Sequence, residues 1–526
     1  MPGNVYNSDV KPLALSLLAV SLGAQNLVPD ATPTFQTGTR LVQVDVVVQN
    51  KNGAVEGLTK SDFTVLDNGV PQTIAIFSLR DIKNVPRSAP LPKGVVSNRP
   101  VSQTGEPVAG TVVLFDRLNT AVEDQGYARL QALKYIEKTS RNEQIALYGL
   151  SKTLKVLQTF TNDRDLLEQA VNRSKPELSM DLATDDLLNG VNDGLFAQAA
   201  GNPRMHGVQE TKQNARDRRE YITAAAFATI ARHLSGLPGR KKLVWITSSL
   251  PISFTEQREY NGFSTIEYQS YGAEMDRSIR ALNDANIGVY PVDPRGVGVD
   301  LADSSVTSAL ILAHMTGGKA TYSNNDLAGA IETVMTDTDL TYTLGFYPSV
   351  DKLDGRYHTI LVRVNQPGVE VRSRRGYSAS LPAKPLTQAR RFGFLDAWSQ
   401  EPLEATDISV RATANRIAGR PGYYAVQVIV DPTELQLTQM NGRWTGSFDI
   451  GIVPDVDHKI KGLQQTIRVN MTQKSYLQAA TAGIVVANPI KVTDVNGKLL
   501  AKDLRLVVLD GASGKAGSVR IPIGQP

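Results

Sequence analysis

The chain has 526 residues, 41% hydrophobic and 21% charged, which is typical of a folded protein and too long for a single hydrophobic core. Its net charge of +4 comes from 56 basic and 52 acidic residues, and its short basic clusters do not alternate with aromatic residues, so nucleic-acid binding is not expected. Cysteine is absent, which excludes disulfides, thiolate metal ligands and a cysteine nucleophile.

The N-terminal stretch has the pattern of an export signal. Lys11 precedes a mostly apolar run over residues 13–24, which is too short to span a bilayer but long enough for a signal-peptide core. Ser21 and Gly23 offer a cleavage site with small residues. We therefore expect a signal peptide over residues 1–24 and an exported product. The alternative is a packed or disordered N-terminal helix. No later stretch is apolar enough to be a transmembrane segment.

Residues 36–80 predict a small β-sandwich-like module. Val42, Val44, Val46 and Val48 alternate along one face of a strand. The dipeptide at residues 68–69, Asn-Gly, lies between two further β-type runs and favours a hairpin. Five prolines then follow within residues 81–109, which we interpret as a semi-rigid linker or as a strap that lies along the surface.

A buried strand that ends in an acid opens the next region. Residues 112–115 are all apolar, as in a strand that is covered on both faces, and Asp116 follows directly. Thr120 and Glu123 have the spacing of a capping box, which predicts the start of a helix. Ligands of open parallel sheets bind at the carboxyl ends of the strands, so Asp116 marks a candidate site.

Strand and helix patterns alternate through residues 110–350, which predicts an α/β fold with a Rossmann-like, doubly wound, mostly parallel sheet. The predicted strands are residues 111–115, 144–150, 154–158, 242–247, 287–292 and 340–346. The predicted helices are residues 122–140, 163–172, 217–234, 271–286, 305–315 and 326–337. The second and third strands are too close for a crossover and predict an antiparallel hairpin at the sheet edge.

Three further segments complete the predicted organisation. The polar stretch at residues 174–216 interrupts the alternation as an insertion, either a partly helical lid or a disordered segment. Residues 351–378 have the turns and runs of a β extension. Residues 385–526 predict a C-terminal β-sandwich, because alternating runs are separated by hairpin signals such as Asn441 followed by Gly442.

Several of these stretches together resemble the VWFA-related domain proteins of the acidobacterial type, within the von Willebrand factor type A (VWA) superfamily. The stretches that carry the resemblance are residues 116–120, 238–249, 287–296, 342–348, 354–358 and 374–377. With the N-terminal module, the resemblance covers about residues 35–378. It implies a VWA-like α/β domain used for adhesion or complex formation, it implies export, and it supplies no established reaction.

The resemblance also implies a metal site, which this sequence matches only in part. Typical VWA domains hold Mg²⁺ with oxygens from three loops. By that pattern the metal ligands and partner-binding residues are Asp116, Asn119, Thr120 and Ser248. Leu118 stands where a hydroxyl is expected, and Ser248 stands near the expected third-loop acid, so the site is degenerate. A single carboxylate predicts weak Mg²⁺ binding. The alternative is that these side chains cap the helix and accept backbone N–H groups.

Three functional hypotheses follow. The first is an exported, non-enzymatic binding protein in which Asp116, Asn119, Thr120 and Ser248 line the contact with an unidentified protein partner. The second is a hydrolase with Ser248 as nucleophile, Asp293 as its acid, and either His314 or His206 as the base. The third is a purely structural envelope protein whose α/β domain has lost ligand binding and has an occluded crevice.

Overall fold

A computed structural model describes residues 41–81, 91–92, 94–99, 110–138, 144–184, 203–250, 254–257, 267–270, 273–297, 304–336, 340–348, 354–379, 386–454, 462–492 and 501–523. The predicted signal peptide and most of the predicted linker lie outside these residues. Residues Arg40–Pro526 form one compact unit. None of the helices in the described ranges combines the length and the apolar character needed to cross a membrane.

The central element is a five-stranded sheet with the order β13-β10-β7-β8-β9. Its strands are β7 (Thr111–Asp116), β8 (Ile145–Leu150), β9 (Leu154–Thr161), β10 (Lys241–Ile246) and β13 (Ile287–Val292). The strands pair in parallel except β9, which is antiparallel to β8. The edge hairpin predicted from the short connection is thus confirmed. Every residue of the four parallel strands is buried, as expected for a sheet covered on both faces.

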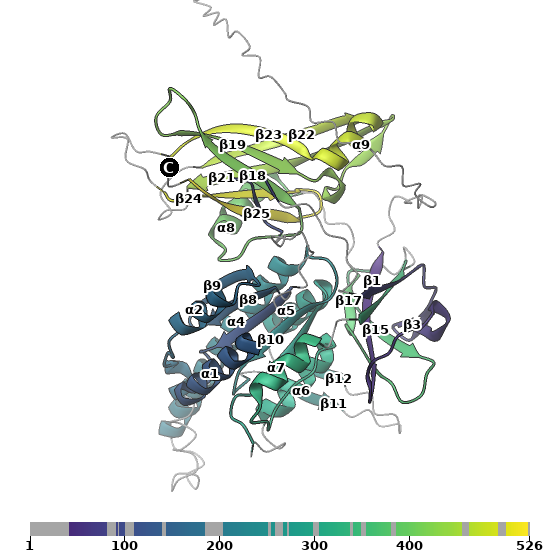
Figure 1. The fold of residues 1–526 in the computed structure, drawn as a ribbon, viewed down its shortest axis with the longest axis vertical. Coiled ribbons are helices and arrows are strands. Elements are labelled where there is room, and N and C mark those ends of the chain that lie inside the picture. The colour runs from purple at the N-terminus through teal and green to yellow at the C-terminus, as the bar shows by residue number, and fades with distance from the viewer. Residues whose placement is uncertain are drawn as a thin grey trace, which may run out of the picture. The chain divides into compact units, whose positions relative to one another are not determined.

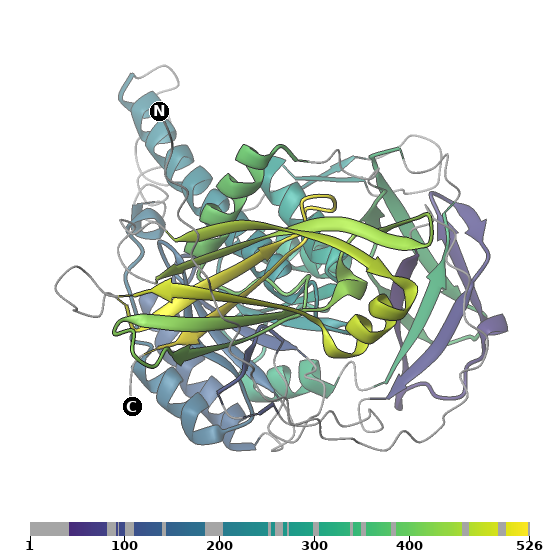
Figure 2. The same ribbon diagram turned by 90° about the horizontal axis from the view of Figure 1, so that it is seen from above.

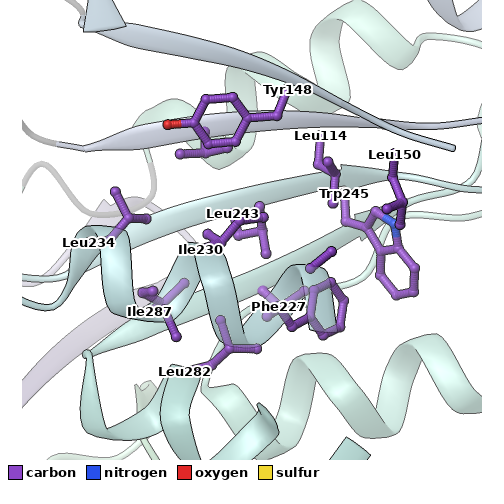
Figure 3. Close-up of a cluster of buried hydrophobic side chains, with 14 of the residues drawn as sticks. Leu114, Tyr148, Leu150, Phe227, Ile230, Leu234, Leu243, Trp245, Leu282 and Ile287 are labelled. Atoms are coloured by element: carbon purple, nitrogen blue, oxygen red, sulfur yellow. The ribbon is translucent and has the colours of Figure 1, made fainter. Parts of the chain in front are cut away.

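Helices cover both faces of this sheet (Figure 1). On one face, α4 (Pro203–Leu234), α5 (Ala273–Asp284) and α6 (Ser304–Thr316) pack on strand residues such as Leu114 and Trp245 (Figure 3). On the other, α1 (Val122–Lys138), α2 (Arg164–Arg173) and α7 (Leu327–Thr336) cover residues such as Val113 and Val244. This is a doubly wound, Rossmann-like arrangement. Residues 203–216 of the predicted insertion are the start of α4, and residues 185–202 lie outside the description.

The predicted sixth strand of the α/β domain belongs to a different sheet, so that part of the prediction is wrong. β14 (Leu340–Phe346) is antiparallel to β1 (Val42–Asn50) and β5 (Ile76–Asp81), and β16 (Glu370–Ser373) pairs with the other edge of β1. An apolar run predicts a buried strand but does not identify its partner, which here is about 300 residues away. The short β2 (Gly53–Ala54) also pairs with β1.

A second antiparallel sheet shares its hydrophobic core with β1 and β14. It has the order β17-β15-β3-β4, from β3 (Phe63–Asp67), β4 (Val70–Gln72), β15 (Tyr357–Val364) and β17 (Gly376–Ser378), and the 3-10 helix η1 (Lys60–Asp62) precedes β3. The strands of the predicted 36–80 module therefore pair with strands that follow residue 340, and the two segments form one packed unit.

A buried polar cluster ties three strands of this unit together. The carboxylate of Asp67 is fully buried, with the Tyr377 hydroxyl donating to Oδ2 over 3.0 Å and His358 Nδ1 at 2.9 Å from Oδ1. His358 Nε2 lies 3.3 Å from Asp354 Oδ1. Two of the stretches that carry the family resemblance, residues 354–358 and 374–377, therefore meet here because a buried carboxylate requires hydrogen-bond donors.

The C-terminal region contains two antiparallel sheets around one hydrophobic cluster. The first comprises β18 (Val410–Arg416), β19 (Tyr423–Val430) and β23 (Ile484–Lys491), and β6 (Val96–Ser97), which lies in the predicted linker, pairs with β18 at its edge. The second comprises β20 (Thr438–Met440), β21 (Arg443–Pro454), β22 (Leu463–Thr472), β24 (Asp503–Leu509) and β25 (Ala516–Pro522). Helix α8 (Gln388–Gln400) packs on β21 and β24, and α9 (Gln473–Ala482) lies at one end of the strands (Figure 2). The remaining elements are η4 (Pro432–Glu434) and the pair β11 (Phe254–Gln257) and β12 (Glu267–Ser270).

The end of α4 contacts the segment that leads into the C-terminal region. The Gly236 N–H donates to Thr406 Oγ1 over 3.0 Å, and the Thr406 hydroxyl donates to the carbonyl of His233. His233 Nδ1 lies 2.6 Å from the carbonyl oxygen of Glu404. The Ser235 hydroxyl donates to Asp407. Two segments about 170 residues apart therefore share a dense set of hydrogen bonds.

Gly236→Ala tests this contact. A Cβ at residue 236 would lie 1.5 Å from the carbonyl oxygen of Thr406, so the backbone must move. We expect a loss of about 3 kcal/mol in the free energy of unfolding, measured by urea denaturation. The control is Gly126→Ala in α1, where a Cβ meets nothing within 4 Å and is expected to stabilise the helix by about 0.5–1 kcal/mol. Equal effects of the two substitutions would contradict the contact.

His233 predicts an acid-dependent loss of stability. Burial lowers the pKa of His233 from 6.5 to about 4. As the pH falls from 6.5 towards 4, His233 becomes protonated in the unfolded chain but stays neutral in the folded chain. Stability is therefore full above pH 6.5 and decreases below it. The loss reaches about 3 kcal/mol. We expect urea denaturation at several pH values to show that the free energy of unfolding of His233→Gln decreases less steeply than that of the wild type between pH 6.5 and 4. Above pH 7 the two curves should be parallel. Parallel curves throughout would contradict the prediction.

Candidate functional site

The carboxylate of Asp116 lies at the carboxyl end of β7, with only 2% of the residue exposed. Its Oδ1 accepts the backbone N–H groups of Leu118 (3.0 Å) and Asn119 (2.9 Å). Its Oδ2 accepts Asn119 Nδ2 (2.8 Å) and the indole N–H of Trp245 (3.0 Å). Burial raises the pKa of Asp116, and the hydrogen bonds from Asn119, Thr247 and Trp245 oppose that rise. Both carboxylate oxygens are therefore held by donors within the protein.

Asn119 joins this turn to the long helix α4. Its amide nitrogen donates to Thr223 Oγ1 over 3.1 Å in addition to Asp116. Its amide oxygen accepts Nη1 of Arg219 over 3.2 Å. All of these side chains are buried. One amide side chain therefore fixes the position of the turn relative to two residues of α4.

Thr120 and Ser248 close the network on the β10 side. The backbone N–H of Ser248 donates to Thr120 Oγ1 over 3.3 Å, and the Ser248 hydroxyl donates to the carbonyl of Asn119 over 3.4 Å. The four predicted site residues therefore meet at the carboxyl edge of the parallel sheet. The network that they form is largely closed to solvent, whereas the prediction placed it on an open contact surface.

The sequence reasoning missed Arg219, Thr223 and Trp245. Trp245 lies within an apolar run and has the pattern of an ordinary core residue (Figure 3). Arg219 follows Arg218 and resembles a solvated helix surface. The apolar face of α4, which includes Phe227 and Leu234, extends back to residues 223 and 219 at helical spacing. That spacing is the signal that points Arg219 towards the core.

The oxygen atoms of this network are not arranged as ligands for Mg²⁺. A hard cation needs oxygen lone pairs directed at a common point. Here the Asp116 oxygens face N–H groups, the Asn119 amide oxygen faces a guanidinium, and Thr120 Oγ1 faces a backbone N–H. In the part of the chain that the structure describes, no three acidic or histidine side chains are grouped so as to hold a metal ion.

Two recesses border the network. One is lined mainly by the β7–α1 turn and the end of α2, and its polar lining residues are Asp116, Arg117, Thr120, Gln125, Arg129, Ser174 and Lys175. The other lies between the ends of β10 and β13, and its polar lining residues are Thr247, Ser248, Asp293, Ser305, Thr321 and Tyr322. Of the predicted site residues, Asp116 and Thr120 reach the first recess and Ser248 reaches the second.

The residues of the hydrolase hypothesis do not assemble a catalytic triad among the described side chains. The Ser248 hydroxyl donates to a backbone carbonyl. The carboxylate of Asp293 is bound by the guanidinium of Arg295 through contacts of 2.7–3.1 Å. The side chain of His314 contacts Arg375 over 3.4 Å, and that of His206 lies outside the description. Asp293 and Arg295 form the ion pair that their spacing suggests.

Comparisons with known proteins give distant likenesses. No family model matches the chain, and no curated protein matches it. The solved structures that match include the PilB minor pilin from Streptococcus sanguinis (14% identity, TM-score 0.23, 44% of this chain and 61% of the pilin). They also include an aerotolerance-related membrane protein from Bacteroides fragilis (9% identity, TM-score 0.25, 44% of this chain and 98% of that protein). A third is a von Willebrand factor type A protein from Catenulispora acidiphila (9% identity, TM-score 0.24, 86% of this chain and 74% of that protein). At such low TM-scores, the fold assignment rests on the strand order of this chain.

Asn119→Ala tests whether the network stabilises the fold. The substitution removes one donor to Asp116 and the acceptor of Arg219, both in a buried site, so we expect a loss of about 3 kcal/mol in the free energy of unfolding. Asn172→Ala is the matched control, because Asn172 is exposed and accepts from Arg129, and its change should stay within about 0.5 kcal/mol. Similar urea midpoints for the two variants would show that the network contributes little.

Proposed function

We propose that the chain is an exported, non-enzymatic binding protein of the cell envelope or surface that contacts a protein partner with the carboxyl edge of its parallel sheet. The observation that carries the proposal is the closed network of Asp116, Asn119, Thr120 and Ser248. It fixes the loops at this edge, while its own polar atoms are used within the protein. The network thus acts as a rigid support, and the exposed residues around it contact the partner.

On the side of this edge formed by α1 and the loop after β13, acidic side chains lie near exposed apolar ones, which include Val122, whereas Arg117, Arg129 and Lys175 lie on the α2 side. Glu123 and Asp124 lie in the first turn of α1, and burial together with the charges of Glu123 and Asp293 raises the pKa of Asp124. Asp124 therefore lies close to two other carboxylates, and the charge of Arg295 opposes the rise in its pKa. Val297 follows on the next loop and is 63% exposed. This combination favours a partner that presents a basic side chain beside an apolar one, because complementary charge steers association.

A structural envelope protein without a ligand is the second candidate function. The burial of Asp116, Asn119 and Ser248 favours it, because a crevice that is closed at its centre has no open site for a partner's side chain. The two candidates differ in what they require of the rim. A binding protein needs a fixed set of rim residues, whereas a structural protein tolerates charge reversal there.

A photo-cross-linking experiment separates the two candidates. A photoreactive amino acid in place of Val297 should give one discrete adduct in intact cells. Asp124→Lys should reduce the adduct yield at least about fivefold, since the loss of a rim contact worth 1 kcal/mol or more has that effect. Glu137→Lys is the matched control, because this exposed residue lies on α1 far from the rim. No adduct, or a yield unaffected by Asp124→Lys, would favour the structural candidate.

A further inference from the structure

Arg219 of α4 is buried at the carboxyl edge of the parallel sheet. Only 1% of Arg219 is exposed, whereas the side chain of its neighbour Arg218 is 59% exposed and pairs with Asp181 over 2.8 Å. A buried cation is costly unless hydrogen-bond acceptors and negative charge surround it. Arg219 Nη1 meets the amide oxygen of Asn119, and the same amide donates to the carboxylate of Asp116.

The amide of Asn119 thus relays between a cation and an anion. Its oxygen faces the guanidinium and its nitrogen faces the carboxylate, so the amide dipole is favourably aligned with both charges. Thr223, one helical turn after Arg219, accepts from the same amide nitrogen over 3.1 Å. Trp245 completes the set from β10, and its indole packs edge-to-face on Phe227 of α4 with 4.9 Å between ring centroids.

We infer that Arg219 is the resident cation of this strand-end network. It supplies from within the chain the positive charge that a metal ion supplies in an oxygen-lined site, and it makes the network independent of divalent ions. The hydrogen-bond donors of this network explain why the Arg219 guanidinium and a metal ion cannot occupy the site together. A metal ion requires unused oxygen lone pairs, but each Asp116 oxygen already accepts two N–H groups, and the Asn119 oxygen faces a guanidinium whose positive charge would repel a metal ion. This role of Arg219 does not depend on a protein partner and is separate from the proposed function.

The inference assigns different roles to two adjacent arginines of one helix. Arg219→Met removes the buried charge and leaves the Asn119 oxygen without this donor. Arg218→Met removes only an exposed ion pair, which contributes little to stability. Arg219→Lys keeps the charge and therefore separates the effect of charge from that of packing.

The experiment is a thermal-unfolding series on the full chain with MgCl₂, MnCl₂ or EDTA, together with the electron paramagnetic resonance signal of free Mn²⁺. We expect the wild type to keep the same Tm in all three solutions and to bind no Mn²⁺ at millimolar concentration. Arg219→Met should lower the Tm by about 5–10 °C, and Arg218→Met by no more than about 2 °C. Arg219→Lys should recover more than half of the loss.

Three results would overturn the inference. A saturable Mn²⁺-dependent rise in the Tm of the wild type would show that the site accepts a metal ion. Equal Tm values for Arg219→Met and Arg218→Met would show that the buried charge is dispensable. An Arg219→Lys variant as unstable as Arg219→Met would assign the effect to packing. If Arg219→Met does not fold, the wild-type titration and Arg219→Lys still decide the question.

Discussion

The arrangement of the α/β domain depends on the burial of one carboxylate. Asp116 ends a fully buried strand, so its charge is removed from water and must be met by donors. Those donors come from its own turn, from Asn119 and from Trp245. The need to satisfy a single acid therefore fixes the turn into α1, the register of β10 beside β7 and, through Asn119, the position of α4.

Much of the fold could be predicted from local patterns. The unbroken apolar run before Asp116 identifies a doubly covered strand, and the three-residue connection after Leu150 identifies the hairpin of β8 and β9. The resemblance to VWA domains grouped Asp116, Asn119, Thr120 and Ser248, and they do meet because the parallel strands that carry them end at one edge. What failed was the pairing of β14, because the residues that select its partner lie near the N-terminus.

The character of the site was harder to predict than its location. Arg218 and Arg219 are adjacent residues of the same type, so residue type alone does not distinguish them. The packing of α4 makes Arg218 an exposed ion-pair partner and Arg219 a buried cation. Whether an oxygen can bind a ligand depends on what already donates to it. That depends on residues about 100 positions away, which no motif of four or five residues contains. Side chains that resemble a ligand-binding motif can therefore form a fold-stabilising network whose oxygens are unavailable to ligands.

The pairing of β1 has a consequence for the order in which the chain acquires structure. β1 is synthesised before both of its main pairing partners, β14 and β16, which follow about 300 residues later. Its valines can meet nearby core residues such as Val55 and Phe63, but the edges of β1 lack β14 and β16 while the parallel sheet is synthesised, and contacts of such long sequence separation form slowly. The nascent chain therefore carries open strand edges on β1 until β14 and β16 have been made, and an open edge can pair with another chain.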